Sequence, residues 1–363
     1  MKPFFSDTPV NSGRQLELDI TRGLAVLFMI AVHTLMEFGD PVFKESPLGT
    51  VIDFLGSPPA APVFMFLLGA GLVYSRKGTP RELLNRGLRL LALGYVLSLA
   101  YIGLPAYVAD WLGRPFPLPS SPLDAIFIND ILQFAGLTLM FFGAIKAITP
   151  QPPALLLIAL GIAFGLANSQ LLGVQVQGLA AAATTGLIWG SGPQSFFPFL
   201  TWIIYPLAGY VFATFLIRAT DKTAFYGALL PVSLVLAIAL YYVTTEVFRM
   251  PIELDGPGYY HHDLIVGSLF LLFTLFWIGL WYFLTRSVAL PAMLMVTVTR
   301  WSRNVTAIYV IHWIIIGWLG VWLGFGHYGA PTFILIFLAV AAAADALAEI
   351  YARLRTPTAI PAR

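Results

Sequence analysis

The first apolar segment of the chain contains four ionisable side chains, and this feature constrains the fold more than any other. Residues 18–35 are long enough to cross most of a hydrocarbon core as a helix, because a helix rises about 1.5 Å per residue. At helical spacing, one stripe of this segment holds Asp19, Arg22, His33 and Glu37. Because ionisable groups are costly to insert into a membrane, such a stripe normally faces a cavity or a partner. The plainer alternative is an interfacial Asp19–Arg22 pair with a structural His33.

The composition excludes an ordinary soluble domain. Hydrophobic residues make up 58% of the chain and charged residues 10%, with a mean hydropathy of +0.82. These values indicate a polytopic helical membrane protein. There is no cysteine, which excludes disulfides, thiolate metal sites and a cysteine nucleophile. The net charge of +2 is too small to indicate nucleic acid binding, and no histidine pair has metal-ligand spacing on a helix, so we expect no metal.

Ten apolar segments predict an all-α bundle of membrane-spanning helices. They cover residues 18–35, 58–74, 83–105, 125–145, 154–172, 197–217, 225–244, 265–284, 305–323 and 331–351. Residues 173–195 are mildly apolar but rich in Gly, Gln, Thr and Ser, which predicts an outer loop or a re-entrant segment. Residues 287–300 are apolar, short and flanked by arginine, which predicts an interfacial segment on the cytoplasmic face. We therefore expect one transmembrane domain over residues 16–352, between a cytoplasmic segment 1–15 and a cytoplasmic tail 353–363.

The distribution of basic residues supports this layout. With both ends of the chain in the cytoplasm, the inner segments contain 17 of the 20 Lys and Arg residues. Only Lys44, Arg114 and Arg249 fall on the outer side. A further span at residues 173–195 would invert every later segment and remove this asymmetry.

A pair of arginines marks the inner end of the third span. Arg86 and Arg89 are three residues apart, and the segment that carries them continues directly into the membrane. Guanidinium groups present their donors in a fixed fork that suits phosphate. The alternative is that both residues only set the orientation of the span.

The outer half of the first span contains a candidate acid–base unit. His33 and Glu37 are one helical turn apart. A neutral imidazole accepts a proton from a hydroxyl or an amine, and a carboxylate beside it orients the ring and stabilises the imidazolium. His312 is expected in the middle of the ninth span, where a core histidine and a functional one are both reasonable interpretations.

Five segments resemble the transmembrane acyltransferase superfamily, and most closely the bacterial relatives of heparan-α-glucosaminide N-acetyltransferase. They are RQLELDITRGLAVLFMIAVH from residue 14, PVFMFLLGAG from 62, NDILQFAG from 129, FFPFLTWIIYPLAGYVF from 196 and SRNVTAIYVIH from 302. Members of the superfamily that modify bacterial O-antigens carry Arg, ten residues and then His on the first span, as Arg22 and His33 do here. They also carry an Arg-x-x-Arg pair at the third span, as Arg86 and Arg89 do.

The resemblance implies that acyl-coenzyme A enters from the cytoplasm and that a glycan on the far side accepts the acyl group. The heparan enzymes have Asn in place of His33 and their catalytic His in the following loop. Residues 37–57 of this chain contain no His, so the catalytic role is assigned to His33 alone, assisted by Glu37. Arg22, Arg86 and Arg89 are expected to bind the phosphates of acetyl-coenzyme A or another acyl-coenzyme A.

The sequence therefore predicts a multi-pass acyltransferase of the bacterial cytoplasmic membrane, with a carbohydrate acceptor and membrane lipid as partners and a homodimer as an option. The candidate residues for binding the acceptor are Asp53, Asn129, Asp130, Gln133, His261, His262, Asp263 and His312. The alternative is a transporter or flippase that uses the charged stripe of the first span as a relay. Transporters often contain internal repeats with paired broken helices, and we identify no such repeat here.

Overall fold

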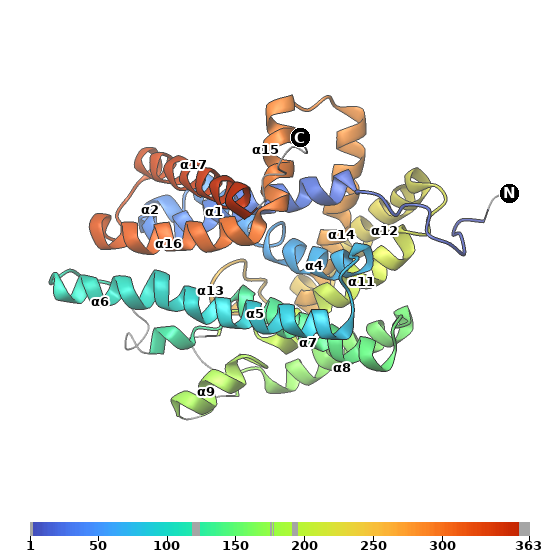
Figure 1. Ribbon diagram of the computed structural model, residues 1–363, viewed down its shortest axis with the longest axis horizontal. Coiled ribbons are helices and arrows are strands. Elements are labelled where there is room, and N and C mark those ends of the chain that lie inside the picture. Colours follow the sequence, from blue (N-terminus) through green and yellow to red (C-terminus); the bar gives the residue numbers. More distant parts are fainter. Residues whose placement is uncertain (1–2, 118–123, 175, 177, 191–194, 356–363) are drawn as a thin grey trace, which may run out of the picture.

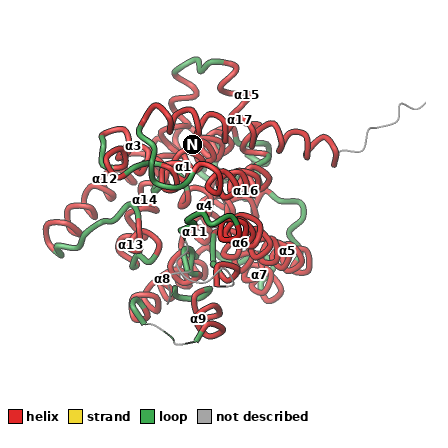
Figure 2. The backbone as a smooth tube through the Cα atoms, turned by 90° about the vertical axis from the view of Figure 1, so that its left-hand side faces the viewer, coloured by secondary structure: helices red, strands yellow, loops and turns green. Residues whose placement is uncertain are grey.

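The computed structural model describes residues 3–117, 124–174, 176, 178–190 and 195–355. It is 76% helical, and this part of the chain contains no β-strand, so the prediction of an all-α fold is confirmed. Figure 1 shows that α5 and α6 follow one another in a single long line, with α16 running alongside α6. In Figure 2, α5, α6 and α7 are seen close to end-on, so these helices run in similar directions.

Within the described residues, ten helical stretches are long and apolar enough to cross a membrane. They are α1 (Leu16–Phe38), α3 with α4 (Pro47–Gly56 and Ala61–Tyr74), α5 with α6 (Pro80–Ser98 and Leu104–Trp111), α7 (Ile131–Ile148), α8 (Ala154–Leu171), α10 with α11 (Phe199–Trp202 and Ile204–Leu216), α12 (Lys222–Tyr242), α14 (Leu264–Ser287), α16 (Val305–Leu323) and α17 (Ala330–Arg355). The shorter helices are α2 (Pro41–Lys44), α9 (Leu179–Gly186), α13 (Gly256–Tyr260) and α15 (Ala292–Arg303). The number and order of the predicted spans are confirmed.

The second span starts earlier than predicted. It was expected to begin at Pro58, after a polar connection, but α3 already begins at Pro47. The Ser46 hydroxyl accepts a hydrogen bond from the Gly49 amide at 3.2 Å, and Pro47 occupies the first helical position, so both signals for a helix start are present. Residues 57–60, which include two prolines, interrupt the span before α4 continues it.

The fourth span starts later than predicted. It was expected from Ala125, but α7 begins at Ile131 because Asp130 caps it. The Asp130 carboxylate accepts from the Ile131 amide at 2.7 Å, and the Gln133 side chain accepts from the Asp130 amide at 3.2 Å. Asn129 and Asp130 therefore lie just outside the helix, at the end of the bundle that the distribution of basic residues predicts to face outward. We call this end the outer end and the opposite one the inner end.

Two other segments form no membrane-spanning helix of their own within the described residues. In the region 173–195, α9 is only eight residues long and too short to cross a membrane, and residues 175, 177 and 191–194 lie outside the described part. The segment 287–300 was expected at the interface and forms most of α15, which projects from the bundle beside the end of α14 (Figure 1). The third span passes its predicted end at Pro105 and continues to Trp111, because Pro105 lies in the first turn of α6, where proline is tolerated.

The first helix lies at the centre of the bundle. α1 packs against α3, α4, α14, α15, α16 and α17, and 67% of its membrane window is buried inside the protein. By contrast, only 11% of the window of the seventh span, which contains α12, is buried. The charged stripe of α1 is therefore enclosed by other helices, as its ionisable residues require.

Glycines allow the neighbouring helices to approach closely. A Cβ atom at Gly69 of α4 would lie 1.9 Å from the Pro206 carbonyl oxygen of α11, and one at Gly209 of α11 would lie 1.9 Å from that of Phe66 in α4. Backbone approach through small residues is typical of helix packing in membranes. This contact fixes α4, which lines the site described below.

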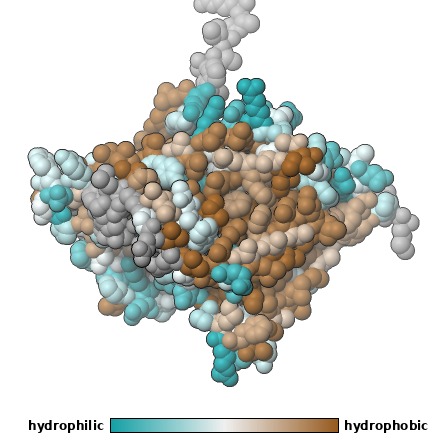
Figure 3. All heavy atoms as spheres, turned by 90° about the horizontal axis from the view of Figure 1, so that it is seen from below, coloured by the Kyte–Doolittle hydropathy of each residue, from teal (hydrophilic) through white to brown (hydrophobic). Residues whose placement is uncertain are grey.

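The exposed sides of the helix bundle suit contact with lipid. Large apolar side chains of α12 are exposed, among them Val232, Val235 and Ile238, whose exposed fractions are 56%, 63% and 61%. Figure 3 shows a broad hydrophobic region across one face of the molecule, with hydrophilic residues mostly around its edge. Such a surface on ten apolar helices indicates a multi-pass membrane protein.

Candidate active site

Two histidines from distant parts of the chain form a hydrogen-bonded pair inside the bundle. His33 Nδ1 of α1 lies 2.8 Å from His312 Nε2 of α16, and His312 Nδ1 lies 3.0 Å from the Ile308 carbonyl oxygen. A carbonyl only accepts, so His312 Nδ1 carries a proton and, in the neutral ring, its Nε2 accepts one. His33 Nδ1 then donates to His312, which leaves the lone pair on His33 Nε2 free to accept a proton.

Aromatic rings hold the His33 imidazole in position. The ring stacks on Trp313 with a centroid separation of 4.2 Å, and Trp313 in turn contacts Tyr101 at 4.8 Å. Gly317 allows this arrangement, because a Cβ there would lie 1.9 Å from the Tyr101 carbonyl oxygen. The chain between α5 and α6 is therefore pressed against α16, and the His33 ring is fixed by packing as well as by its hydrogen bond.

Two cavities on the outer side of the bundle meet at His33. Their volumes, counted together with adjoining space that is open to solvent, are about 580 Å³ and 850 Å³. Both are lined by His33, Met36, Asp130, Phe197 and Tyr260. Asp53 of α3 lines the smaller cavity, and Glu37 and Trp313 line the larger one. The outer end of the bundle thus surrounds the His33 ring with carboxyl groups, a phenol and aromatic faces.

The prediction that Glu37 orients the His33 ring does not match the geometry. The partner of His33 Nδ1 is His312, for which the sequence allows both a core and a functional role. His312 is completely buried, and its ring takes the orienting place that was assigned to the carboxylate. Glu37 lies one helical turn from His33 in the wall of the larger outer cavity.

A third cavity opens at the inner end of the bundle and has a volume of about 1330 Å³, counted together with adjoining space that is open to solvent. Its wall contains three arginines and one carboxylate, namely Arg22, Arg86, Arg303 and Asp19. Arg22 is held in place, since its Nη1 lies 3.7 Å from Asp19 Oδ1 and 3.5 Å from the Ser302 hydroxyl. Arg86 and Arg303 are exposed. The inner cavity is therefore cationic and suits an anionic ligand.

Two of the three arginines that were expected to bind phosphate lie in the wall of this cavity. They are Arg22 and Arg86, whereas Arg89 is exposed on α5 and is not in the wall. Arg303 was missed, although it directly precedes the ninth span in the segment SRNVTAIYVIH. Tyr309 was missed as well, although it lies three residues before His312 and therefore close to the same helix face.

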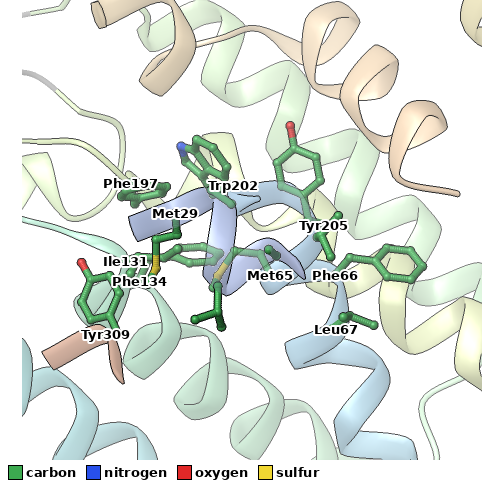
Figure 4. Packing of buried hydrophobic residues seen from close by; sticks show 14 of the residues in the cluster. Met29, Met65, Phe66, Leu67, Ile131, Phe134, Phe197, Trp202, Tyr205 and Tyr309 are labelled. Atoms are coloured by element: carbon green, nitrogen blue, oxygen red, sulfur yellow. The ribbon is translucent and has the colours of Figure 1, made fainter. Parts of the chain in front are cut away.

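A single layer of side chains separates the inner cavity from the smaller outer cavity. The residues that line both are Met29, Phe64, Ile131 and Tyr309, contributed by α1, α4, α7 and α16. We call these four residues the partition. Figure 4 shows Met29, Ile131 and Tyr309 beside one another. The Tyr309 hydroxyl donates to Asp130 Oδ2 at 2.5 Å, which ties the partition to the outer cavities.

The model of one protein family, described as an acyltransferase domain, matches residues 15–348. The chain belongs to this acyltransferase family. The match includes α1 and both histidines, and with the ten apolar helices it makes the protein a membrane acyltransferase. A search of curated proteins gave no match.

Several residues predicted to bind the acceptor have partners within the acyltransferase itself. Asn129 donates to the Ala183 carbonyl at 3.1 Å, Gln133 donates to that of Ile128 at 2.9 Å, and Asp263 caps α14 through the Val266 amide. None of these side chains lines the three cavities. Of the predicted acceptor residues, Asp53 and Asp130 lie in the walls of the three cavities described here.

His262 belongs to a buried hydrogen-bond network beside the outer cavities. Its Nδ1 donates to the Tyr259 carbonyl at 2.7 Å, and its Nε2 accepts from the Tyr205 hydroxyl at 2.9 Å. Burial lowers the pKa of His262 to about 4. The network holds the chain around Tyr260, which lines both outer cavities and was missed in the sequence. The neighbouring His261 lies against Gly190 and outside the three cavity walls.

Proposed function

We propose that this acyltransferase transfers a short acyl group, acetyl above all, from acyl-coenzyme A in the cytoplasm to a carbohydrate on the far side of the bacterial cytoplasmic membrane. One observation carries the proposal. The cationic inner cavity and the outer cavity that contains His33 are separated only by the partition. A donor and an acceptor bound on opposite sides can therefore meet without either crossing completely.

The inner cavity suits the phosphates of coenzyme A. Arg22 is half-buried and ordered by Asp19, whereas Arg86 and Arg303 stand at the exposed mouth. Guanidinium groups bind phosphate through charge-assisted, often bidentate hydrogen bonds. Arg22 and His33 are eleven residues apart on α1, which corresponds to about 16 Å along a helix. An extended pantetheine arm suits this separation between bound phosphates and the reacting carbonyl.

His33 is the proposed general base. Its Nε2 takes the proton of an acceptor hydroxyl or amine while that oxygen or nitrogen attacks the thioester carbonyl carbon. The new C–O or C–N bond forms, the C–S bond breaks, and the imidazolium returns its proton to the departing thiolate. His312 stabilises the positive charge on His33, because its Nε2 accepts the Nδ1 proton.

The outer cavities suit a carbohydrate. Asp53, Glu37 and Asp130 provide hydrogen-bond acceptors for sugar hydroxyls, and Tyr260 provides a hydroxyl of its own. Phe197 lines both cavities and offers an apolar face of the kind that packs against a sugar ring. A mainly apolar cavity with a few convergent polar groups is typical of small-molecule sites.

The direct test uses purified protein in sided proteoliposomes. Radiolabelled acetyl-coenzyme A is supplied to the face that carries Ser75, and a panel of glycans is supplied to the opposite face. We expect a labelled glycan, identified by mass spectrometry, that forms only when donor and acceptor are on these sides. The proposal fails if no glycan is labelled in either orientation. Movement of a solute across the membrane without acyl transfer would favour a transporter instead.

A further inference from the structure

We infer that the partition, formed by Met29, Phe64, Ile131 and Tyr309, contacts the acyl group of the donor and sets the longest chain that the enzyme accepts. This inference rests on the proposed function. It assigns a specificity site to residues that belong neither to the arginine cluster nor to the histidine pair.

The acyl group lies ahead of the phosphates on the path between the inner and the outer cavity. In an acyl thioester the acyl chain is the leading end when the phosphates stay behind. The arginines lie at the inner end, and His33 lines the outer cavity together with all four partition residues. For the thioester carbonyl to reach a nucleophile beside His33, the carbonyl has to enter the partition. The acyl chain then lies against the partition side chains or beyond them.

The space beyond the partition is needed by the acceptor. The smaller outer cavity begins immediately behind it, and His33, Asp53 and Asp130 surround that space. An acceptor has to occupy this cavity in order to be activated by His33. A long acyl chain would enter the volume that the acceptor needs, whereas a short chain fits within the partition itself.

Two of the four partition residues determine the size of the opening. The Tyr309 side chain is held by the hydrogen bond of its hydroxyl to Asp130, and Ile131 is β-branched, which restricts the rotation of its side chain. The side chains of Met29 and Phe64 have neither restraint. They come from two neighbouring helices, α1 and α4, and Met29 has an unbranched, flexible side chain. Met29 and Phe64 are therefore the residues whose size controls which acyl groups pass.

The test compares donors of increasing length. kcat/KM is measured for acetyl-, butyryl- and hexanoyl-coenzyme A in the natural protein and in the Met29→Ala and Phe64→Ala variants. One methylene in an apolar pocket changes kcat/KM by about 10- to 200-fold. We expect the natural protein to favour acetyl, and either variant to raise the ratio of hexanoyl to acetyl by at least about tenfold. A Phe64→Trp variant should change this ratio in the opposite direction.

Matched substitutions provide the controls. Phe164 and Met295 are half-buried like Phe64 but line none of the cavities described, so Phe164→Ala and Met295→Ala should leave the chain-length ratio unchanged. Milder variants, Met29→Val and Phe64→Leu, replace any alanine variant that does not fold. Acyl transfer with the same chain-length ratio in all folded variants would overturn the partition inference alone. No transfer from any donor in the natural protein would overturn the proposed function and this inference with it.

Discussion

At the residue scale, the buried His262 makes the stability of the protein depend on pH. Its pKa is about 4 in the folded chain, compared with 6.5 for an unperturbed histidine, because burial disfavours the charged ring. Below pH 6.5 the unfolded chain binds a proton that the folded chain does not. Stability is therefore lost as the pH falls from about 6.5 to about 4, and the full loss from this residue is about 3 kcal/mol.

This prediction is measured by thermal unfolding in detergent at pH 7.5 and pH 5. The natural protein should lose more stability between these two values than a His262→Gln variant, in which the titrating group is absent. The other four histidines remain in the variant and supply the background. The same pH dependence in both proteins would show that His262 is not a neutral, buried ring.

At the element scale, the crossing of α4 and α11 depends on a glycine. A Cβ at Gly209 would lie 1.9 Å from a backbone oxygen of α4, so the Gly209→Ala variant has to separate the two helices. Overpacking of this kind costs about 1–3 kcal/mol, although alanine in place of glycine favours a helix by about 1 kcal/mol. We expect a clear fall in melting temperature. Gly227→Ala in α12 is the control, because nothing lies within 4 Å of a Cβ at that position. The melting temperature of this variant should equal that of the natural protein or be higher.

The inner end of α5 provides a second comparison on one element. Arg86 lines the cationic cavity and Arg89 does not. Loss of a hydrogen bond to a charged group costs about 1.5–3 kcal/mol, and the exposure of Arg86 favours the lower value. Arg86→Ala should therefore raise the KM for acetyl-coenzyme A about tenfold, while Arg89→Ala changes it little. KM is measured by steady-state kinetics. Equal effects of the two substitutions on KM would contradict a role in donor binding that depends on the position of Arg86 in the cavity wall.

At the scale of the whole molecule, the distribution of charge predicts the orientation in the membrane. Ser75 lies in the wall of the arginine-lined cavity, and Gly113 follows the far end of α6. A reporter fused after Ser75 should give a cytoplasmic signal and one fused after Gly113 an extracytoplasmic signal. An extracytoplasmic signal at Ser75 would place the arginine-lined cavity on the opposite side of the membrane from the cytoplasmic coenzyme A that we propose as the donor.

The sequence was sufficient to predict the global architecture. Long apolar segments and the asymmetry of basic residues determine ten spans, because hydrophobic length is a local property. Helical spacing also placed Arg22 and His33 on one stripe of α1. Arg22 lines the inner cavity, and His33 lines both outer cavities. Boundaries were less certain where capping residues decide them. Asp130 caps the start of α7 and so delays the fourth span, and Pro47 starts the second span well before its most apolar part.

The contacts that define the site come from long-range packing and were only partly predictable. His33 and His312 are 279 residues apart in the chain, and no periodicity joins them. For the same reason Glu37, a neighbour of His33 in sequence, was given the orienting role that His312 occupies in the structure. Arg303 and Tyr260 reach their cavities through the packing of α15, α16 and the outer loop, which one sequence does not specify.

The histidine pair carries the central claim, and one set of kinetic measurements tests it most directly. Turnover of acetyl-coenzyme A and the binding of coenzyme A are compared in the natural protein and in the His33→Ala and His312→Ala variants. Removal of a general base costs about 10²–10⁴-fold in rate, so His33→Ala should lose that much turnover and still bind coenzyme A normally. His312→Ala removes the hydrogen bond that stabilises the imidazolium, worth about 1.5–3 kcal/mol for a charged group, and should lose roughly 13- to 160-fold. Near-normal acetyl transfer by a folded His33→Ala protein would contradict the role of His33 as the base.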